Sequence, residues 1–275
     1  MNLLARRSPQ GRPWGALFVC LWLAAVSAQV AAACPADRVD LRAEVDYVHD
    51  GDTLRLADGR ALRLIGLDTP ELARDDRRAE PLAGAARDRL RDLLRAAGMR
   101  LDLRYDAERE DRYGRTLAHA HLPDGRNLTA LLLEEGLAST LAVPPNVHGW
   151  ACYREAERRA RAAGRGLWAL PGHRVHEAAT LDPARRGFIL VRGRVDARQP
   201  RKSGVRLLLD GGLVVWIGRA DLTYFPALEQ LVGQRVEVRG MLRQRGDERQ
   251  IRVRHPAALS RIDADAPGGR GNGGG

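Results

Sequence analysis

The chain has 275 residues, a length that suits one or two domains of ordinary size. Its apolar fraction of 44% is enough to bury a core, which excludes a wholly disordered chain. The formal net charge is +10, and Lys202 is the only lysine among 45 basic residues. Such an arginine excess suits bidentate recognition of phosphate, although a solvated basic surface would have the same composition.

Residues 1–33 have the pattern of a signal peptide. Basic residues precede the apolar stretch WGALFVCLWLAAVSA, and small residues end at Ala28 and again at Ala33. The pattern predicts an exported protein, either periplasmic or secreted. Two alternatives remain open. Residues 14–33 are long enough for an uncleaved membrane anchor, and Cys34 could be lipidated.

Two cysteines, Cys34 and Cys152, remain once residues 1–33 are removed. An exported protein matures in a compartment that permits disulfides, so we expect these two residues to pair. The alternative is two free thiols. A distance above about 7 Å between their Cα atoms would exclude the bond.

Alternating apolar and polar residues predict strands in the first third of the chain. Residues 40–49 alternate in this way, and 54–56 and 61–67 continue the pattern around an Asp-Gly turn. These three segments predict an antiparallel meander. In residues 80–98 the period changes to that of a helix, with Pro81 expected in its first turn and Gly98 at its end.

The pattern of short strands and helices continues to residue 168. Strands are predicted at 100–106 and 115–122, and helices closed by glycine at 127–136 and 150–164. Five strands with three helices over residues 38–168 predict an α+β domain built on an OB-type barrel.

A second β-rich unit is predicted after a linker at residues 169–184. Residues 185–262 contain an alternating strand, a hairpin around Asp210-Gly211-Gly212 and two further strands around a second turn, which predict a small OB-like barrel. Residues 263–275 are rich in glycine and are predicted to be disordered. The second unit has no acidic cluster, so we expect no second active site there. Its basic strands leave two alternatives open, a nucleic-acid-binding surface or a solvated basic face.

Acidic side chains gather at the strand ends of the first unit. Asp52 begins the second predicted strand and Asp68 ends the third, and these ends are adjacent in a meander. Converging carboxylates repel unless a proton or a cation lies between them, and oxygen ligands favour Ca²⁺ or Mg²⁺. The alternative is that these aspartates only stabilise turns. Glu71 follows Pro70 at a fixed offset from Asp68, where a carboxylate can deprotonate water.

Three segments resemble the signature blocks of the staphylococcal nuclease (thermonuclease) family. They are HDGDTLRL, RLIGLDTPE and DRYGRTLAHAHLPDGRNLTALLLEEGLA, in the family's order, and the resemblance covers about 40–168. It implies an OB barrel with three helices and Ca²⁺-dependent hydrolysis of DNA and RNA. We expect single-stranded substrates to be preferred and the protein to be a monomer. The alternative is a non-catalytic nucleic-acid-binding module with the same fold.

The resemblance also implies roles for individual residues. Asp52, Asp68 and the carbonyl of Thr69 would bind Ca²⁺, and Asp50 would support the metal site through water. Glu71 would be the general base. The remaining positions would contact phosphate: Arg63 and Arg115 the scissile group, Arg112 and Tyr113 a terminal one.

Overall fold

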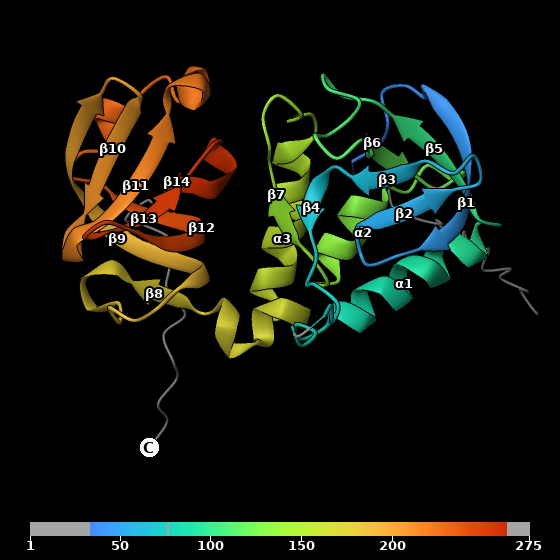
Figure 1. Cartoon of the computed structure of the whole chain (residues 1–275), viewed down its shortest axis with the longest axis horizontal. Coiled ribbons are helices and arrows are strands. Elements are labelled where there is room, and N and C mark those ends of the chain that lie inside the picture. Colours follow the sequence, from blue (N-terminus) through green and yellow to red (C-terminus); the bar gives the residue numbers. More distant parts are fainter. Residues whose placement is uncertain (1–33, 76, 263–275) are drawn as a thin grey trace, which may run out of the picture. The chain divides into compact units, whose positions relative to one another are not determined.

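The computed structural model of the chain describes residues 34–75 and 77–262 (Figure 1). The predicted signal peptide and the predicted disordered tail lie outside these residues. Among the residues described, no helix combines the length and the apolar character needed to cross a membrane. The same residues are mostly β, with three α-helices, and their strands form two barrels. The predicted fold class is therefore confirmed.

The first barrel is closed by five strands, in the spatial order β1-β2-β3-β6-β5. β3 and β6 run parallel and every other pair is antiparallel, which is the arrangement of an OB barrel. Leu54, Leu62 and Leu103 point into its core and are fully buried. The strands are β1 (Leu41–Val48), β2 (Thr53–Leu56), β3 (Ala61–Leu64), β5 (Arg100–Arg104) and β6 (Thr116–His121).

Gly66 breaks the third predicted strand in two. Its φ is 93°, a left-handed value that favours glycine, and a Cβ at this position would overlap the ring of Tyr153. After the break, β4 (Gly66–Asp68) leaves the barrel and pairs with β7 (Ser139–Leu141). The prediction of one continuous strand over 61–67 was therefore wrong, and Asp68 lies on a separate two-stranded sheet.

Three helices accompany this barrel: α1 (Ala83–Ala96), α2 (Leu128–Glu134) and α3 (Trp150–Ala162). α1 begins after Leu82, whose left-handed φ of 71° is not a helical backbone conformation. Pro81 therefore precedes the helix and is not in its first turn. At the start of α2, the side chain of Asn127 accepts a hydrogen bond from the backbone N–H of Ala130. This side chain supplies the partner that a helix N-terminus otherwise lacks.

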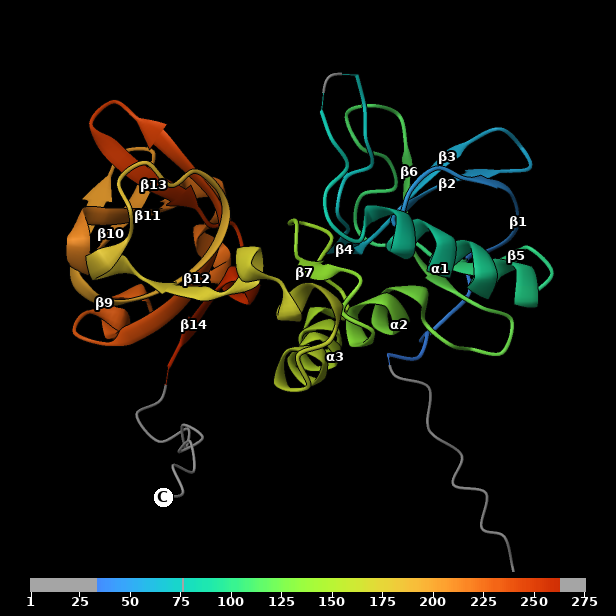
Figure 2. The ribbon, with the colours of Figure 1, turned by 90° about the horizontal axis from the view of Figure 1, so that it is seen from below.

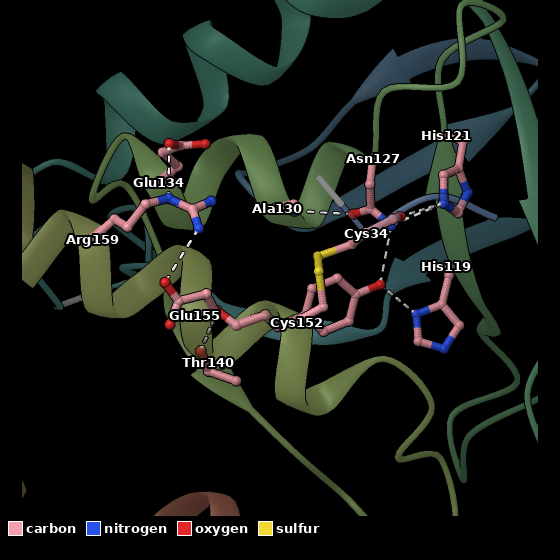
Figure 3. Close-up of a disulfide and its surroundings, with 11 residues drawn as sticks. Cys34, His119, His121, Asn127, Ala130, Glu134, Thr140, Cys152, Glu155 and Arg159 are labelled. Atoms are coloured by element: carbon pink, nitrogen blue, oxygen red, sulfur yellow. Dashed lines mark hydrogen bonds and ion pairs between the residues drawn. A yellow bond between two sulfur atoms is a disulfide. The ribbon is translucent and has the colours of Figure 1, made fainter. Parts of the chain in front are cut away.

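A buried polar network attaches α3 to the barrel. The hydroxyl of Tyr153 lies 2.8 Å from Nδ1 of His119 and accepts a hydrogen bond from Nδ2 of Asn127. Burial raises the pKa of Tyr153 to about 12, so the phenol remains protonated and neutral. Nδ2 of Asn127 also lies 3.0 Å from Nε2 of His121. The close-up draws the contacts of Asn127 as dashed lines (Figure 3). The network therefore connects two histidines of β6 and the N-cap residue of α2 to Tyr153 on α3.

A disulfide between Cys34 and Cys152 lies beside this network (Figure 3). The Cα atoms are 5.6 Å apart, within the range that a disulfide spans. The bond closes a segment with a sequence separation of 118 residues and ties the start of the described chain to α3.

Replacing both cysteines by serine is expected to lower the free energy of unfolding by about 4 kcal/mol. A cross-link across so long a segment restricts the unfolded chain strongly, and native disulfides typically contribute about 2–5 kcal/mol. Urea unfolding of the oxidised protein and the double variant measures the difference. A change below 1 kcal/mol would contradict this prediction.

The second barrel repeats the strand order of the first. β9, β10, β11, β13 and β12 form a ring that closes through the β12–β9 pairing, and Figure 2 looks into that ring. β11 and β13 are parallel and the other pairs are antiparallel, as in the first barrel. The strands are β9 (Gly187–Arg201), β10 (Gly204–Leu209), β11 (Leu213–Gly218), β12 (Arg235–Arg245) and β13 (Glu248–Arg252), extended by β8 (Val175–Glu177) and β14 (Leu259–Arg261).

A buried ion pair joins the second barrel to α3. Nη1 of Arg239 on β12 lies 2.6 Å from both carboxylate oxygens of Glu157 on α3. The two side chains are only 8% and 3% exposed. Thr140 on β7 bonds to both residues: its N–H donates to Glu157 and its carbonyl accepts from Arg239. The charges are thus paired and hydrogen-bonded, as buried charges must be.

Candidate active site

Asp50 and Asp52 shape the turn between β1 and β2. Oδ1 of Asp50 accepts hydrogen bonds from the backbone N–H groups of Asp52 (3.0 Å) and Thr53 (2.7 Å). This is the local turn bonding that aspartate commonly provides. It fixes the backbone direction at Asp52, which is only 5% exposed.

Asp52 reaches across to the segment that follows β4. Its Oδ2 accepts hydrogen bonds from the backbone N–H (3.2 Å) and the hydroxyl (2.9 Å) of Thr69. The two segments approach closely because Gly51 has no side chain. A Cβ there would lie 2.7 Å from the methyl group of Thr69 and 2.8 Å from Ala86. The two acidic segments are therefore in direct contact.

Arg63 on β3 lies between the two carboxylates of the site. Its guanidinium forms ion pairs with Asp52 and with Oδ1 of Asp68, the latter at 3.1 Å. Burial lowers the pKa of Arg63, and the charge of Asp68 opposes this shift. Desolvation also raises the pKa of Asp68 although its side chain keeps 54% exposure, and Arg63 opposes that shift in turn. Both carboxylates thus face one cationic centre.

Glu71 is exposed and lies at the base of a loop. Its backbone N–H donates to Oε2 of Glu80 at 3.0 Å, and its carbonyl accepts from the N–H of Glu80 at 2.9 Å. Further along, Arg74 and Arg77 exchange two backbone hydrogen bonds. The backbone of Glu71 is held in this way, while its carboxylate has no side-chain partner among the described residues.

Arg115 is held by Asp111 in the turn before β6. Nε and Nη2 of Arg115 lie 2.8 and 2.7 Å from Oδ2 of Asp111. The charge of Arg115 contributes to the lowered pKa of Arg63, so the two guanidinium groups are close enough to interact. Tyr113 is 69% exposed and is no core residue. The guanidinium of Arg112 lies 4.7 Å from the centre of its ring and that of Arg115 lies 5.7 Å away.

The structure therefore brings together most of the residues selected from the sequence. Asp52, Thr69, Arg63 and Asp68 are in direct contact, and Glu71 lines the same cleft as Asp68 and Thr69. Among residues 34–75 and 77–262, no cluster of three or more His, Cys, Asp or Glu side chains could hold a metal. A metal bound here would accordingly need backbone or water oxygens beside the two carboxylates.

Two acidic residues of the site were missed in the sequence. Glu80 holds the backbone of Glu71 and lines the same cleft, but nothing in its own surroundings marks it. Asp111 orients Arg115, and the spacing of four residues within DRYGR was a signal for that pairing.

Comparison with known proteins locates the chain among nucleases. The family described as staphylococcal nuclease homologue matches residues 61–170. A thermonuclease of Staphylococcus intermedius is 36% identical over 135 residues, which are 47% of this chain and 79% of that protein. A thermonuclease of Staphylococcus hyicus is 34% identical over 46% of this chain and 75% of its own length. A micrococcal nuclease of Shigella flexneri is 32% identical over 48% and 76%.

These matches extend over most of each relative and over about half of this chain. Fold, residue pattern and identity agree, and the chain belongs to the staphylococcal nuclease homologue family.

Proposed function

We propose that this chain is a Ca²⁺-dependent nuclease that hydrolyses phosphodiester bonds in DNA and RNA. The observation that carries the proposal is the convergence of Asp52 and Asp68 on one cationic centre, with Glu71 in the same cleft. The nuclease names of its relatives support the same conclusion.

The donor set fits a calcium ion. The carboxylates of Asp52 and Asp68 both contact the guanidinium of Arg63, so they lie close enough to share a cation, and hard oxygen ligands are those that Ca²⁺ prefers. Asp52, Asp68 and the carbonyl of Thr69 would hold the ion, and Asp50 would support it through water. When bound, Ca²⁺ would neutralise charge on the phosphate and make a nearby water more acidic.

The chain's own residues divide the remaining work. Glu71 accepts the proton of the attacking water, which its exposed carboxylate and fixed backbone allow. Arg63 and Arg115 bind the scissile phosphate and stabilise the charge that develops on it. To do so, Arg63 exchanges its ion pairs with Asp52 and Asp68 for phosphate oxygens, and Arg115 exchanges its pair with Asp111. Water adds to phosphorus, the bond to the 5′ oxygen breaks, and that oxygen takes a proton from solvent water to leave as a hydroxyl. The other product is a 3′-phosphate, as the family resemblance implies.

Arg112 and Tyr113 complete the proposed phosphate contacts. Nη2 of Arg112 donates to the Tyr113 hydroxyl at 2.5 Å, so the two exposed polar groups already lie together. A guanidinium and a phenol at such a position suit a terminal phosphate.

Nuclease activity on single-stranded DNA is expected to require Ca²⁺. The assay compares the folded protein in millimolar Ca²⁺ with the same sample after addition of a Ca²⁺-selective chelator. We expect degradation in the first case and a loss of at least a hundredfold in the second, because the carboxylates then lack the ion they are proposed to hold. Absence of cleavage with any divalent ion, by a sample that still binds DNA, would instead favour the non-catalytic binding module.

We also propose that the protein is exported and monomeric. The sequence pattern of residues 1–33 and the Cys34–Cys152 disulfide support export, since disulfides persist in oxidising compartments. Mass spectrometry of the mature N-terminus separates cleavage, an uncleaved anchor and a lipid on Cys34. Light scattering gives the molar mass in solution and so tests whether the protein is a monomer.

A further inference from the structure

The net positive charge of the chain is concentrated in the second barrel. Residues 38–168 contain 23 basic and 23 acidic residues, so the catalytic unit is formally neutral. Residues 185–262 contain 17 basic and 7 acidic residues. Long-range attraction of a polyanion depends on net positive charge. Any such attraction must therefore come mainly from the second barrel.

One face of this barrel combines an aromatic ring with arginines. Arg206 on β10 pairs with Trp216 on β11, and Trp216 pairs with Arg252 on β13. Directly paired residues point to the same side of a sheet. Their neighbours along the strands, Leu207, Val215 and Ile251, are fully buried in the barrel core. The row of three therefore faces outward; we call it, together with Arg243 and Arg245 on β12, the Trp216 face.

The cations on this side of the barrel fall into two groups, one with acidic partners and one without. Arg206 pairs with Glu248, and Arg252 lies 3.5 Å from Asp221. By contrast, Arg243, Arg245 and Lys202 are exposed, and the structure gives their side chains no hydrogen bond or ion pair with any described residue. Charged groups of this kind can bind phosphate without first breaking an ion pair.

The Trp216 face and the catalytic acids line one cleft. Asp68 and Glu71 line it from the first barrel, and Trp216, Arg243, Arg245 and Lys202 line it from the second. Its volume is about 1680 Å³, above the range of about 300–1,000 Å³ that is usual for small-ligand pockets. A polymer that enters the active site therefore meets the Trp216 face within the same cleft.

Corresponding strands of the two barrels carry Arg63 and Trp216. In each ring the third strand has a parallel neighbour, and it carries Arg63 in the first barrel and Trp216 in the second. The first position lies among carboxylates, whereas the second lies between two arginines. Aromatic rings with flanking cations are the usual means by which proteins bind unpaired bases and their phosphates.

We propose that the Trp216 face binds the single-stranded part of the polynucleotide beyond the cleaved bond, and so extends the substrate site. This proposal rests on the proposed nuclease function. A base stacks on Trp216, while Arg243, Arg245 and Lys202 bind the phosphates that follow.

The first experiment measures binding separately from cleavage. In the full-length mature protein carrying Glu71→Gln, fluorescence anisotropy gives the affinity for a labelled 20-nucleotide thymidine oligomer. Arg243→Ala/Arg245→Ala is expected to weaken binding at least tenfold. It should also make the slope of log K against the logarithm of the salt concentration less steep by about 1.4, since each phosphate contact to a single strand contributes about 0.7 to that slope. The matched control is Arg194→Ala/Arg198→Ala, an equal loss of charge at two exposed β9 positions outside the cleft. We expect it to change the affinity less than twofold.

The second experiment tests Trp216. Trp216→Ala is expected to weaken binding of the oligomer about tenfold or more, as loss of one stacking side chain does, whereas Trp216→Phe keeps most of the affinity. The same oligomer annealed to its complement should bind more weakly, because paired bases cannot stack. Circular dichroism and thermal unfolding establish that each variant is folded, and the exposed arginine variants test the face even if Trp216→Ala does not fold.

The outcomes separate this proposal from the proposed function. Equal losses in the arginine variant and its control, or unchanged binding by folded Trp216→Ala, would overturn the Trp216 face. Preference for the duplex would do the same. If the wild-type protein cleaves nothing but the binding differences appear, only the nuclease function fails. If it cleaves, the ratio of kcat/KM for the 20-mer to that for a trinucleotide should fall at least tenfold in Arg243→Ala/Arg245→Ala and remain unchanged in the control.

Discussion

Replacing Glu71 by glutamine is expected to lower kcat by about 10²–10⁴-fold, the usual contribution of a general base. Glutamine has nearly the same shape but cannot accept the proton of the attacking water. The carboxylate of Glu71 has no side-chain partner among the described residues, and its backbone bonds to Glu80 do not depend on it. Stability should therefore be unchanged. Initial rates on single-stranded DNA in saturating Ca²⁺, together with a thermal unfolding curve, measure both effects.

Glu80→Gln is the matched control for this experiment. Glu80 lies on the same loop and lines the same cleft, but its carboxylate accepts a hydrogen bond from the backbone of Glu71, which an amide oxygen can also do. We expect a loss of less than tenfold. Near-normal activity of Glu71→Gln, or an equal loss in both variants, would show that Glu71 is not the base.

Replacing Arg239 by methionine is expected to lower the free energy of unfolding by about 3–5 kcal/mol, because Glu157 would remain buried without its partner. Thr140 would also lose the hydrogen bond to its carbonyl. Urea unfolding measures the loss.

Two further variants show whether burial of the charge is the cause. Arg235→Ala, on the same strand, removes an ion pair with Glu177 in which both side chains are half exposed, and we expect it to cost less than about 1 kcal/mol. Arg239→Met/Glu157→Met removes both charges and should recover much of the loss, since an apolar pair can replace a buried ion pair. If the double variant is less stable than Arg239→Met, the explanation by an uncompensated charge is wrong.

Much of the fold follows from local patterns in the sequence. Strict alternation predicted the strands of the first barrel, because one side of each strand faces the core. The division of residues 61–68 into β3 and β4 could not be predicted in this way. It depends on Gly66 lying against Tyr153, a residue far along the chain. Likewise β7, β8 and β14 have three residues each, too few to show a period.

Contacts near the candidate site were likewise predictable from the sequence only in part. Asp52 and Asp68 were selected because strand ends in a meander are adjacent, and Arg63 was selected from the family resemblance. The structure has the charged groups of all three in contact. Glu157 and Arg239 are 82 residues apart, and each stands in an ordinary amphipathic pattern. Their pairing depends on the contact between the two barrels, about which local periodicity carries no information.

The contacts of Thr140 link the evolution of the second barrel to that of the catalytic unit. Its N–H bonds to Glu157, its carbonyl accepts from Arg239, and its strand partner is Leu67, beside Asp68. A chain that ended near residue 168 would lack the cation that Arg239 supplies to Glu157, next to the strand that carries Asp68. The two barrels are therefore not interchangeable modules. In a homologue that lacks the second barrel, a glutamate at the position of Glu157 would have no Arg239 to pair with, so we expect the requirement for that charge to be gained or lost together with the barrel.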